Sequence, residues 1–324
     1  MSNKVLKPKK ASLYQFTQKY SNNIDNCIEF FKSMKWPEGF SCDRCGCHKY
    51  YLVKRVGKTK TSYVLECSSC HKQHSLLSGT IFQSCKIDLY KLLLGIFLFF
   101  NETKGISAVD LCSILDVNYK TALLLENKCR ILMSLSNSDK LLNSPFYEAD
   151  VFNIGAKSKN KAGRASEQQP ILGILSTDKE NNYPRFIKLR VITDYTGLSL
   201  KKNIEKCCVL SHDALLNTDG EKGFNTLNEE IQVKNEKISY EEKDHRLLWL
   251  NIIIGNIKNN ITGIYHGITK REMPLFLNEQ EYRFNHRKMG KTIMDKIKKY
   301  LQRSFPISHR QIVYILNISA PHFS

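Results

Sequence analysis

Four cysteines in two C-x-x-C pairs carry the clearest chemical signal in this sequence. Cys42 and Cys45 form the first pair, and Cys67 and Cys70 form the second pair after twenty-one intervening residues. Each pair can place two thiolates on one cation, and two pairs complete the tetrahedral site that is typical of structural zinc. Such a site has no open position for water, so it organises the chain and performs no reaction. Nearby residues that could replace one of these ligands are Cys47, His48, His71 and His74.

Two aspartates in the second half of the sequence indicate a different metal chemistry. Asp150 lies within an apolar, strand-like run over residues 146–154, and Asp219 ends a later apolar run and precedes Gly220. Phosphoryl transfer in nucleases and recombinases needs carboxylates that converge from distant parts of the chain to hold two divalent cations about 4 Å apart. Neither aspartate identifies such a site alone, because an aspartate at a strand end is commonly a turn former.

The elements around the cysteines are predicted from the spacing of apolar residues. Residues 13–35 show helical spacing, which the Trp-Pro pair at 36–37 interrupts. A cysteine-rich, β-like stretch covers residues 40–82, and helical patterns follow over residues 88–133. Residues 134–145 have the composition of a linker. The zinc site is therefore expected in a small β domain between helices.

The second half of the chain is expected to combine strands with later helices. Helical patterns run from about residue 245 to the end. The strand-like apolar runs lie at residues 146–154, 171–175, 186–192 and 207–217. This order predicts an α/β domain in which the two aspartates belong to different strands.

A helix-turn-helix is predicted within the helical segment. Residues 105–115 form a short amphipathic pattern that Ser107 could cap, residues 116–118 form a tight turn, and residues 119–133 form a second helix. Two packed helices with no role in DNA binding would give a similar pattern. If the second helix is a recognition helix, the residues that face the major groove are Tyr119, Lys120 and Thr121.

The charge of the chain favours nucleic acid as a partner. Lysine and arginine outnumber aspartate and glutamate 49 to 31, and such a surplus suits a polyanion. The excess is clustered: residues 1–60 carry thirteen basic and four acidic residues, and residues 283–310 carry nine and one. Well-solvated lysine-rich faces are the alternative interpretation of a basic composition. They do not account for the clustering.

The cysteine content and the first residues favour a reducing compartment. Eleven cysteines would suggest disulfides in a secreted protein, yet the start MSNKVLKPKK has no apolar core of a signal peptide. We therefore expect the cytoplasm, at the nucleoid, in a bacterium, or the nucleus in a eukaryote. The most apolar run, residues 89–100, is far shorter than the roughly twenty residues that cross a bilayer, and it predicts a buried helix.

Taken together, these features resemble bacterial insertion-sequence transposases of the ISXO-like group, which are related to the eukaryotic Merlin elements. These proteins join an N-terminal zinc ribbon, a helix-turn-helix and an RNase H-like domain of the DDE type. The resemblance covers about residues 35–300. It rests on the ribbon cysteines and on residues 78–82 (SGTIF), 104–108 (KGISA), 119–122 (YKTA), Asp150, Asp219 with Gly220, 249–258 (WLNIIIGNIK), 263–267 (GIYHG) and 282–287 (YRFNHR).

The resemblance implies a set of catalytic residues. Asp150 and Asp219 would hold Mg²⁺, with Mn²⁺ as an alternative. The family's third metal-site residue is glutamate, asparagine or histidine, with a lysine seven residues later, which maps to Asn251 and Lys258. Seven residues make about two helical turns, so these two side chains would share a face roughly 10 Å apart. Asn251 could offer a carbonyl oxygen to a cation and Lys258 could contact a phosphate. Asn256 competes for the third position.

Two departures from the family pattern follow the first aspartate. Val151 stands where the family has a second acid, although Glu148 is nearby, and Gly155-Ala156-Lys157 replaces Gly-Gly-Lys. The basic loop 157–164 fits a segment that follows phosphates, or simply a solvated loop. The residues expected to contact DNA are Tyr119, Lys120, Thr121, Lys258, Arg283 and Arg287.

The sequence thus predicts an α+β multidomain DNA transposase that cleaves the ends of its element and joins the freed 3′-hydroxyl to target DNA. Its partners would be double-stranded DNA and further copies of the chain on that DNA. The alternatives are an inactive, transposase-derived DNA-binding protein and a zinc-ribbon transcription regulator. The predicted regions are a helical basic leader (1–35), a zinc ribbon (36–84), a helix-turn-helix region (85–135), an RNase H-like transposase domain (145–305) and a C-terminal tail (306–324).

Overall fold

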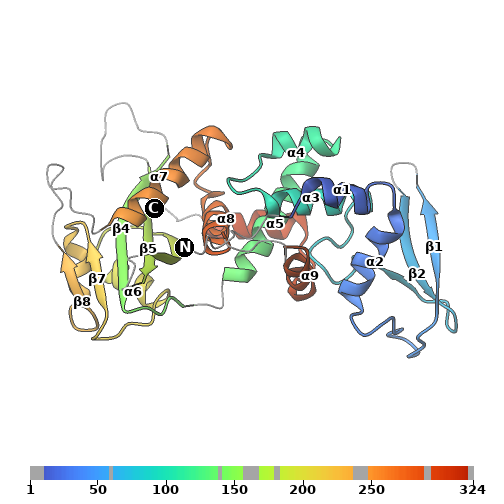
Figure 1. Ribbon diagram of the computed structural model, residues 1–324, viewed down its shortest axis with the longest axis horizontal. Helices are drawn as coiled ribbons and strands as arrows, with labels where there is room; N and C mark the ends of the chain where they lie inside the picture. Colours follow the sequence, from blue (N-terminus) through green and yellow to red (C-terminus); the bar gives the residue numbers. More distant parts are fainter. Residues whose placement is uncertain are drawn as a thin grey trace, which may run out of the picture. The chain divides into compact units, whose positions relative to one another are not determined.

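The protein combines helices and sheets in two compact units, as the predicted α+β class requires (Figure 1). The first unit comprises Met1–Leu135 and Arg287–Ile312, and the second comprises Ser136–His286 and Val313–Ser324. The computed structural model describes residues 11–57, 61–137, 141–155, 168–178, 183–235, 247–287 and 293–319.

A three-stranded antiparallel sheet forms the β part of the first unit. Its order is β1 (Tyr50–Val56), β2 (Thr61–Cys67) and β3 (Gln73–Ser75). Two helices precede it, α1 (Leu13–Tyr20) and α2 (Ile24–Lys35). The predicted lead-in helix and the β-like cysteine-rich stretch are both confirmed, although the lead-in is divided into two helices.

Further helices complete the first unit. They are α3 (Leu89–Asn101), α4 (Ala108–Leu115), α5 (Tyr119–Asn137) and α9 (Ile293–Arg303), and α10 (His309–Ser319) follows. Helix α3 buries most of its side chains and packs against α9, which confirms the predicted buried helix. Within the described residues, we find no helix whose length and hydropathy would let it span a membrane.

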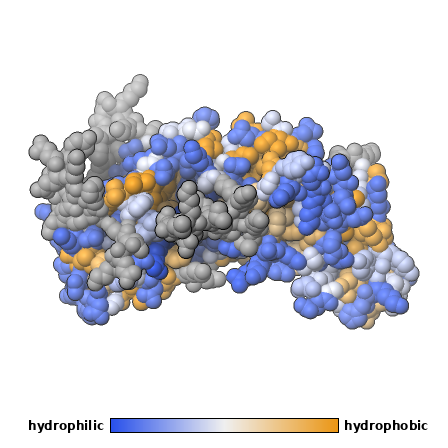
Figure 2. Space-filling view, in the orientation of Figure 1, coloured by the Kyte–Doolittle hydropathy of each residue, from blue (hydrophilic) through white to orange (hydrophobic). Residues whose placement is uncertain are grey.

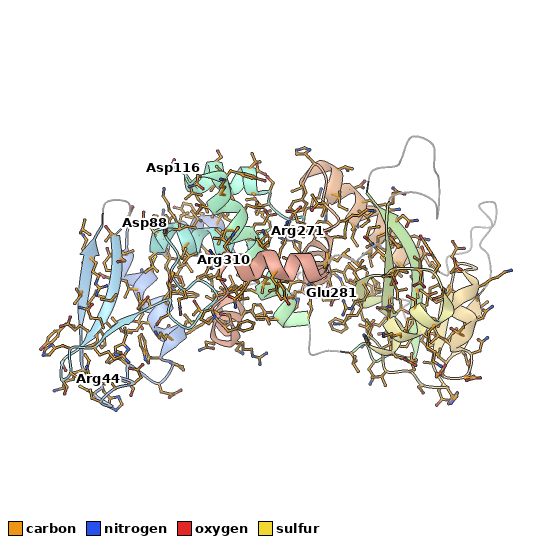
Figure 3. All side chains as sticks on the ribbon, turned by 180° about the vertical axis from the view of Figure 1, so that it is seen from behind. Arg44, Asp88, Asp116, Arg271, Glu281 and Arg310 are labelled. Atoms are coloured by element: carbon orange, nitrogen blue, oxygen red, sulfur yellow. The ribbon has the colours of Figure 1, made fainter. Side chains whose placement is uncertain are left out.

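Side chains at the helix ends define the connection from α4 to α5. The Ser107 hydroxyl accepts a hydrogen bond from the Asp110 N–H at 3.1 Å, so it caps α4 as predicted. Asp116 ends α4 with a left-handed backbone (φ 47°), and its side chain lies at the outer end of the helix pair (Figure 3). The Asn118 carboxamide accepts a hydrogen bond from the Thr121 N–H at 2.9 Å. The turn is therefore fixed on both sides.

A five-stranded mixed sheet forms the centre of the second unit. Strand β4 (Phe146–Ile154) lies in the middle of the order β6-β5-β4-β7-β8. It pairs antiparallel with β5 (Gln169–Thr177), which pairs antiparallel with β6 (Pro184–Val191). On its other side it pairs parallel with β7 (Leu215–Thr218), which pairs parallel with β8 (Gln232–Asn235).

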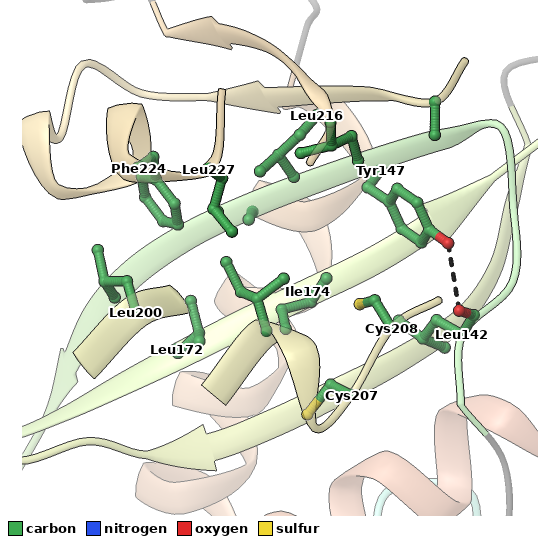
Figure 4. Packing of buried hydrophobic residues seen from close by; sticks show 14 of the residues in the cluster. Leu142, Tyr147, Leu172, Ile174, Leu200, Cys207, Cys208, Leu216, Phe224 and Leu227 are labelled. Carbon is green, nitrogen blue, oxygen red and sulfur yellow. Dashed lines mark hydrogen bonds between the residues drawn. The ribbon is translucent and has the colours of Figure 1, made fainter. Parts of the chain in front are cut away.

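Helices cover both faces of this sheet. On one face, α6 (Gly197–Glu205) and the short 3₁₀ helix η2 (Lys222–Leu227) pack on the sheet, with Tyr147 and Ala149 of β4 in the buried cluster (Figure 4). On the other face, α7 (Leu248–Gly263) and α8 (Met273–Asn285) pack against a cluster that includes Phe152 and Ile154 of β4. Because side chains alternate along a strand, Glu148 and Asp150 belong to the face that α7 covers.

Helix α8 also covers the open edge of β6. The Asn285 side chain accepts a hydrogen bond from the Ile187 N–H at 2.8 Å and donates one to the Ile187 carbonyl at 3.0 Å. The Glu281 carboxylate accepts a hydrogen bond from the Leu189 N–H at 3.2 Å and pairs with Lys188 and Arg190, each at 3.1 Å. Side chains thus satisfy backbone groups that an edge strand otherwise leaves unpaired.

Several sequence predictions differ from the observed elements. Residues 134–137 continue α5 and are not a linker. The strand expected over 207–217 is limited to β7, while α6 and β8 were not predicted. Helix α9 belongs to the first unit, whereas the predicted transposase domain ran to residue 305. The basic loop 157–164 lies outside the described residues.

Candidate functional site

The four ribbon cysteines converge on one point of the first unit. Their sulfur atoms all lie within 4.8 Å of one another. The Sγ atoms of Cys42 and Cys70 are 3.5 Å apart, as are those of Cys45 and Cys67. One tetrahedral cation can be bound by four sulfurs in such an arrangement. The sequence prediction of a four-cysteine cluster is therefore confirmed.

Tight turns bring the two members of each pair together. The Gly46 N–H donates to the Cys42 carbonyl at 2.9 Å, and the His71 N–H donates to the Cys67 carbonyl at 3.0 Å. Burial favours the neutral Cys42 thiol, but hydrogen bonds, led by those from the backbone N–H groups of Arg44 and Cys45, lower its pKa to about 6. A lowered pKa favours the thiolate, which is the metal-binding form.

The alternative ligands named from the sequence have different surroundings. His48 Nδ1 lies 3.0 Å from the Phe40 carbonyl oxygen. His71 Nδ1 lies 3.3 Å from the Glu66 carboxylate. His74 remains close to the cluster, since its ring nitrogen, the Cys42 sulfur and an Asp43 oxygen lie within 4.8 Å of one another. The complete group of four thiols nevertheless matches the closed structural type of zinc site best.

Asp150 lies on the central strand β4 and is affected by charges from two other parts of the chain, the segment after β7 and helix α7. Burial raises its pKa, and the negative charges of Asp219 and Glu221 raise it further. A hydrogen bond from the Val151 N–H, at 2.7 Å, and the positive charge of Lys258 act in the opposite direction. Asp150 is therefore a partly buried carboxylate with a surplus of negative charge around it.

The parallel pairing of β4 with β7 brings the second aspartate beside the first. Thr218, the last residue of β7, pairs with Ala149, so Asp219 follows at the level of Asp150. Gly220 then turns the chain with a positive φ of 69°, a conformation that glycine adopts at no steric cost. Asp150 thus lies in β4, and Asp219 directly follows the neighbouring strand β7. The sequence predicted only that the two aspartates belong to different strands.

Helix α7 contributes the remaining predicted residues. Asn251 is exposed in its first turn, and Lys258 is exposed two turns later with its Nζ atom 5.7 Å from the centre of the Phe152 ring. Phe152 is two residues beyond Asp150 on the same face of β4. Asn256 lies about 140° around the helix from Asn251 and so on a different face. Asn251, and not Asn256, shares the face that contains Lys258.

Comparisons with known proteins match segments of both units. A family model described as an ISXO2-like transposase domain matches residues 144–285, and one described as a transposase zinc-ribbon domain matches residues 23–73. The chain thus contains both domains of the insertion-sequence transposases that its sequence resembles. No curated protein matches the transposase. The first match contains β4, β7 and α7 with their proposed catalytic residues, and the second contains all four ribbon cysteines.

The residues predicted to contact DNA differ in accessibility. Tyr119 is 50% exposed, Lys120 is also exposed, and Thr121 is half-buried at the start of α5. The adjacent helix α4 exposes Val109 and Ile114, and Figure 2 shows hydrophobic surface over this helix. This end of α4 and α5 is therefore an accessible surface of the transposase.

The two arginines predicted near residue 285 have other surroundings. Arg283 is buried, and its guanidinium donates to the buried Glu279 carboxylate at 2.7 and 2.8 Å. Tyr265 donates to the same carboxylate at 2.5 Å. In this structure Arg283 thus neutralises a buried acid and is not exposed to a phosphate. Arg287 is half-buried.

Sequence reasoning missed Glu221 as a neighbour of the site. Its carboxylate contributes to the raised pKa of Asp150. The signal was available, because Glu221 follows directly after Asp219 and Gly220. An acid two residues beyond a strand-end aspartate can reach the same edge of the sheet.

Proposed function

We propose that this transposase is catalytically active: it cleaves DNA at the ends of its own mobile element and joins the freed 3′-hydroxyl to target DNA. Asp150 and Asp219 would bind two Mg²⁺ ions, and Asn251 would supply the third ligand. The observation that supports this proposal is the register of β4 and β7, in which Thr218 pairs with Ala149, so that Asp219 follows at the level of Asp150. Lys258 enters from the same helix face as Asn251.

The topology of the sheet supports an RNase H-like fold. In chain order, the five strands are arranged 3-2-1-4-5. The first three pair antiparallel, and the last two run parallel to the first. This is the strand arrangement of RNase H-like domains. In such a sheet the first strand is central and its aspartate lies next to the end of the fourth strand.

The residues present fit a divalent cation. Asp150 and Asp219 offer hard oxygen ligands. Burial is the main cause of the raised pKa of Asp150, and the negative charges of Asp219 and Glu221 add to it. When bound, Mg²⁺ would activate the attacking oxygen and stabilise the leaving oxygen during displacement at phosphorus. Asn251 would add a neutral oxygen ligand. Lys258 would donate to a non-bridging phosphate oxygen and hold the strand in place.

The first unit would deliver the DNA. The zinc ribbon and the helix pair α4 and α5 would bind the ends of the element, with Tyr119, Lys120 and Thr121 of α5 in the major groove. The accessible N-terminus of α5 supports this assignment. Cleavage at two ends would require further copies of the transposase on the same DNA.

An inactive descendant is the second candidate, and Val151 is the observation that favours it. Val151 replaces an acid of the family pattern, yet it packs against the apolar cluster on the α6 face of the sheet. Asp150 lies on the opposite face. An acid at position 151 would therefore not share the face on which we place the metal ligands, so its loss leaves those ligands unchanged.

The test is Mg²⁺-dependent nicking and joining of duplex DNA that carries the repeats flanking the gene. We expect activity in the wild type and none in Asp150→Ala or Asp219→Ala, with binding to the DNA ends retained. Asp213→Ala removes an exposed carboxylate near the start of β7 and serves as the matched control with full activity. A wild type that binds the ends without cleaving them would instead support the inactive descendant.

A further inference from the structure

A groove of about 1030 Å³ begins directly beside the proposed catalytic residues. The end of β4, the second half of α7 and the turn after it form its walls. Its volume is at the upper end of the range for small-molecule sites, which is about 300–1,000 Å³. The residues that the argument uses are Phe152, Asn153, Gln168, Lys258, Thr262 and His266.

The chemistry of the groove suits a nucleotide. Lys258 is its cation, and none of its lining residues in the described part of the chain is acidic. A phosphate can therefore enter without meeting a like charge. Gln168 contributes a carboxamide, which both donates and accepts hydrogen bonds as the edges of nucleobases do. Phe152 contributes an apolar surface.

Hydrogen bonds hold the walls of the groove. The Gln168 side chain donates to the Gly155 carbonyl at 2.7 Å, and the Tyr195 hydroxyl donates to the Asn153 side chain at 2.8 Å. The Gly267 N–H donates to the Ile261 carbonyl at 3.1 Å. This bond connects the turn after α7, which is the third wall, to the end of that helix. A site that is held before binding loses less entropy when a ligand arrives.

The turn that contains His266 has an unusual backbone. His266 has a φ of 52° and Gly267 a φ of 121°. Few residues other than glycine adopt positive φ, and such positions are concentrated at functional sites. Just before the turn, Tyr265 packs on Phe276, with ring centres 5.4 Å apart. The fold thus holds an exposed imidazole at the groove in a conformation that few other residues adopt.

We propose that this groove binds an unpaired nucleobase of the DNA strand next to the phosphate that is cleaved. His266 stacks on the base, as histidine does on unstacked bases in other nucleic-acid complexes. The Gln168 side chain binds the base edge, and Lys258 binds the adjoining phosphate. The proposal rests on the proposed function, because it takes the strand to be the one whose phosphate lies at Asp150 and Asp219.

Photo-crosslinking of the full chain tests the groove without cleavage. The probe is a ten-nucleotide oligothymidine with one 4-thiothymidine, irradiated without added Mg²⁺ or chelator and followed by tryptic mapping. Cleavage after Lys258 and Lys270 releases residues 259–270, which contain Thr262 and His266. We expect a crosslink in this peptide. Crosslinks confined to other peptides would overturn the proposal.

Two variants test whether a lower crosslink yield reflects lost stacking on the base or a change in folding. His266→Asn removes the ring, while asparagine still tolerates the left-handed backbone. We expect its crosslink yield at subsaturating probe to fall about tenfold, because stacking on one base contributes about 1–3 kcal/mol. Asn259→Ala changes an exposed residue of α7 outside the groove and should retain the wild-type yield. An unchanged yield in His266→Asn would refute the role of the imidazole.

A competitor distinguishes base binding from backbone binding. An abasic oligomer of the same length presents the same phosphates but no bases. We expect unmodified oligothymidine to lower the crosslink yield at a concentration at which the abasic oligomer leaves it unchanged. Equal competition would show that the groove binds only the backbone and would overturn the proposal. The crosslink requires no Mg²⁺. A crosslink in a protein that never cleaves DNA even when Mg²⁺ is supplied would therefore reject the proposed function and retain the groove.

Discussion

The carboxylate of Glu148 accepts a hydrogen bond from the backbone N–H of Leu250 at 2.9 Å. Glu148 is 2% exposed on β4, and Leu250 lies in the first turn of α7. The first N–H groups of a helix have no partner within it, and a side-chain oxygen can satisfy one of them. This bond ties the strand that contains Asp150 to the helix turn that contains Asn251. Glu148 is thus placed to fix the distance between two proposed metal ligands.

Replacement of Glu148 should separate a positioning role from a charge effect. Burial raises the pKa of Glu148 to about 7, so a neutral group is well tolerated there. Glu148→Gln retains an acceptor for the Leu250 N–H and should preserve folding and most of the cleavage rate. Glu148→Ala leaves that N–H unsatisfied and should lower the free energy of unfolding by about 1–3 kcal/mol. Denaturant unfolding and DNA cleavage measure the two effects, and equal loss of cleavage in both variants would contradict positioning.

The two asparagines of α7 provide a direct test of the third metal-site residue. Asn251 shares a helix face with Lys258, whereas Asn256 lies on a different face. Asn251→Ala should therefore slow Mg²⁺-dependent cleavage by more than about tenfold, or 1.4 kcal/mol in the barrier. Asn256→Ala is the matched control and should cleave at the wild-type rate. The reverse order of these rates would assign the third position to Asn256.

The sequence predicted elements best where one local pattern determined the structure. The apolar run at 146–154 matches β4 at both ends, and Ser107 caps α4 as expected. Helix α6 escaped prediction because its short sequence GLSLKKNIE has only three large apolar residues, two of which are buried. Residues 207–217 include Cys207 and Cys208, which lie in the connection between α6 and β7 and are buried in the core cluster, although they belong to no long strand. Tertiary packing decided both cases.

A site residue could be predicted where the spacing of its partners along the sequence indicated that they come together. The cysteine pairs carry their own spacing, so their convergence could be predicted. The neighbourhood of Asp150 and Asp219 follows from parallel pairing of β4 with β7, which no local pattern encodes. We expected Arg283, in a basic segment, to contact DNA. Its partner Glu279, however, lies one turn earlier on α8 and is fully buried. Sequence periodicity did not reveal that burial.

Metal content should test the ribbon. Transposase purified without chelator should contain about one zinc per chain, because four thiolates close a tetrahedral site. Cys67→Ser should release the zinc and unfold the ribbon, since binding and folding of such sites are coupled. Cys85→Ser is the matched control, because Cys85 lies outside the group of four sulfurs. Metal analysis that finds no zinc in the wild type, or full zinc in Cys67→Ser, would contradict the assignment.

Binding to the element ends should depend on the start of α5. Lys120 is exposed there, and a lysine that contacts one phosphate releases a counterion when DNA binds. Lys120→Ala should therefore weaken binding and lower the slope of log affinity against log salt by about one. Lys202→Ala, which removes an exposed lysine from α6 in the second unit, should leave that slope unchanged. Fluorescence anisotropy across a salt series, with Mg²⁺ omitted to prevent cleavage, measures both quantities. If the two variants weaken binding equally, net charge and not a contact at α5 accounts for the affinity. If neither changes it, the DNA surface of the first unit lies elsewhere, and the ribbon strands β1 and β2 become the next segments to test.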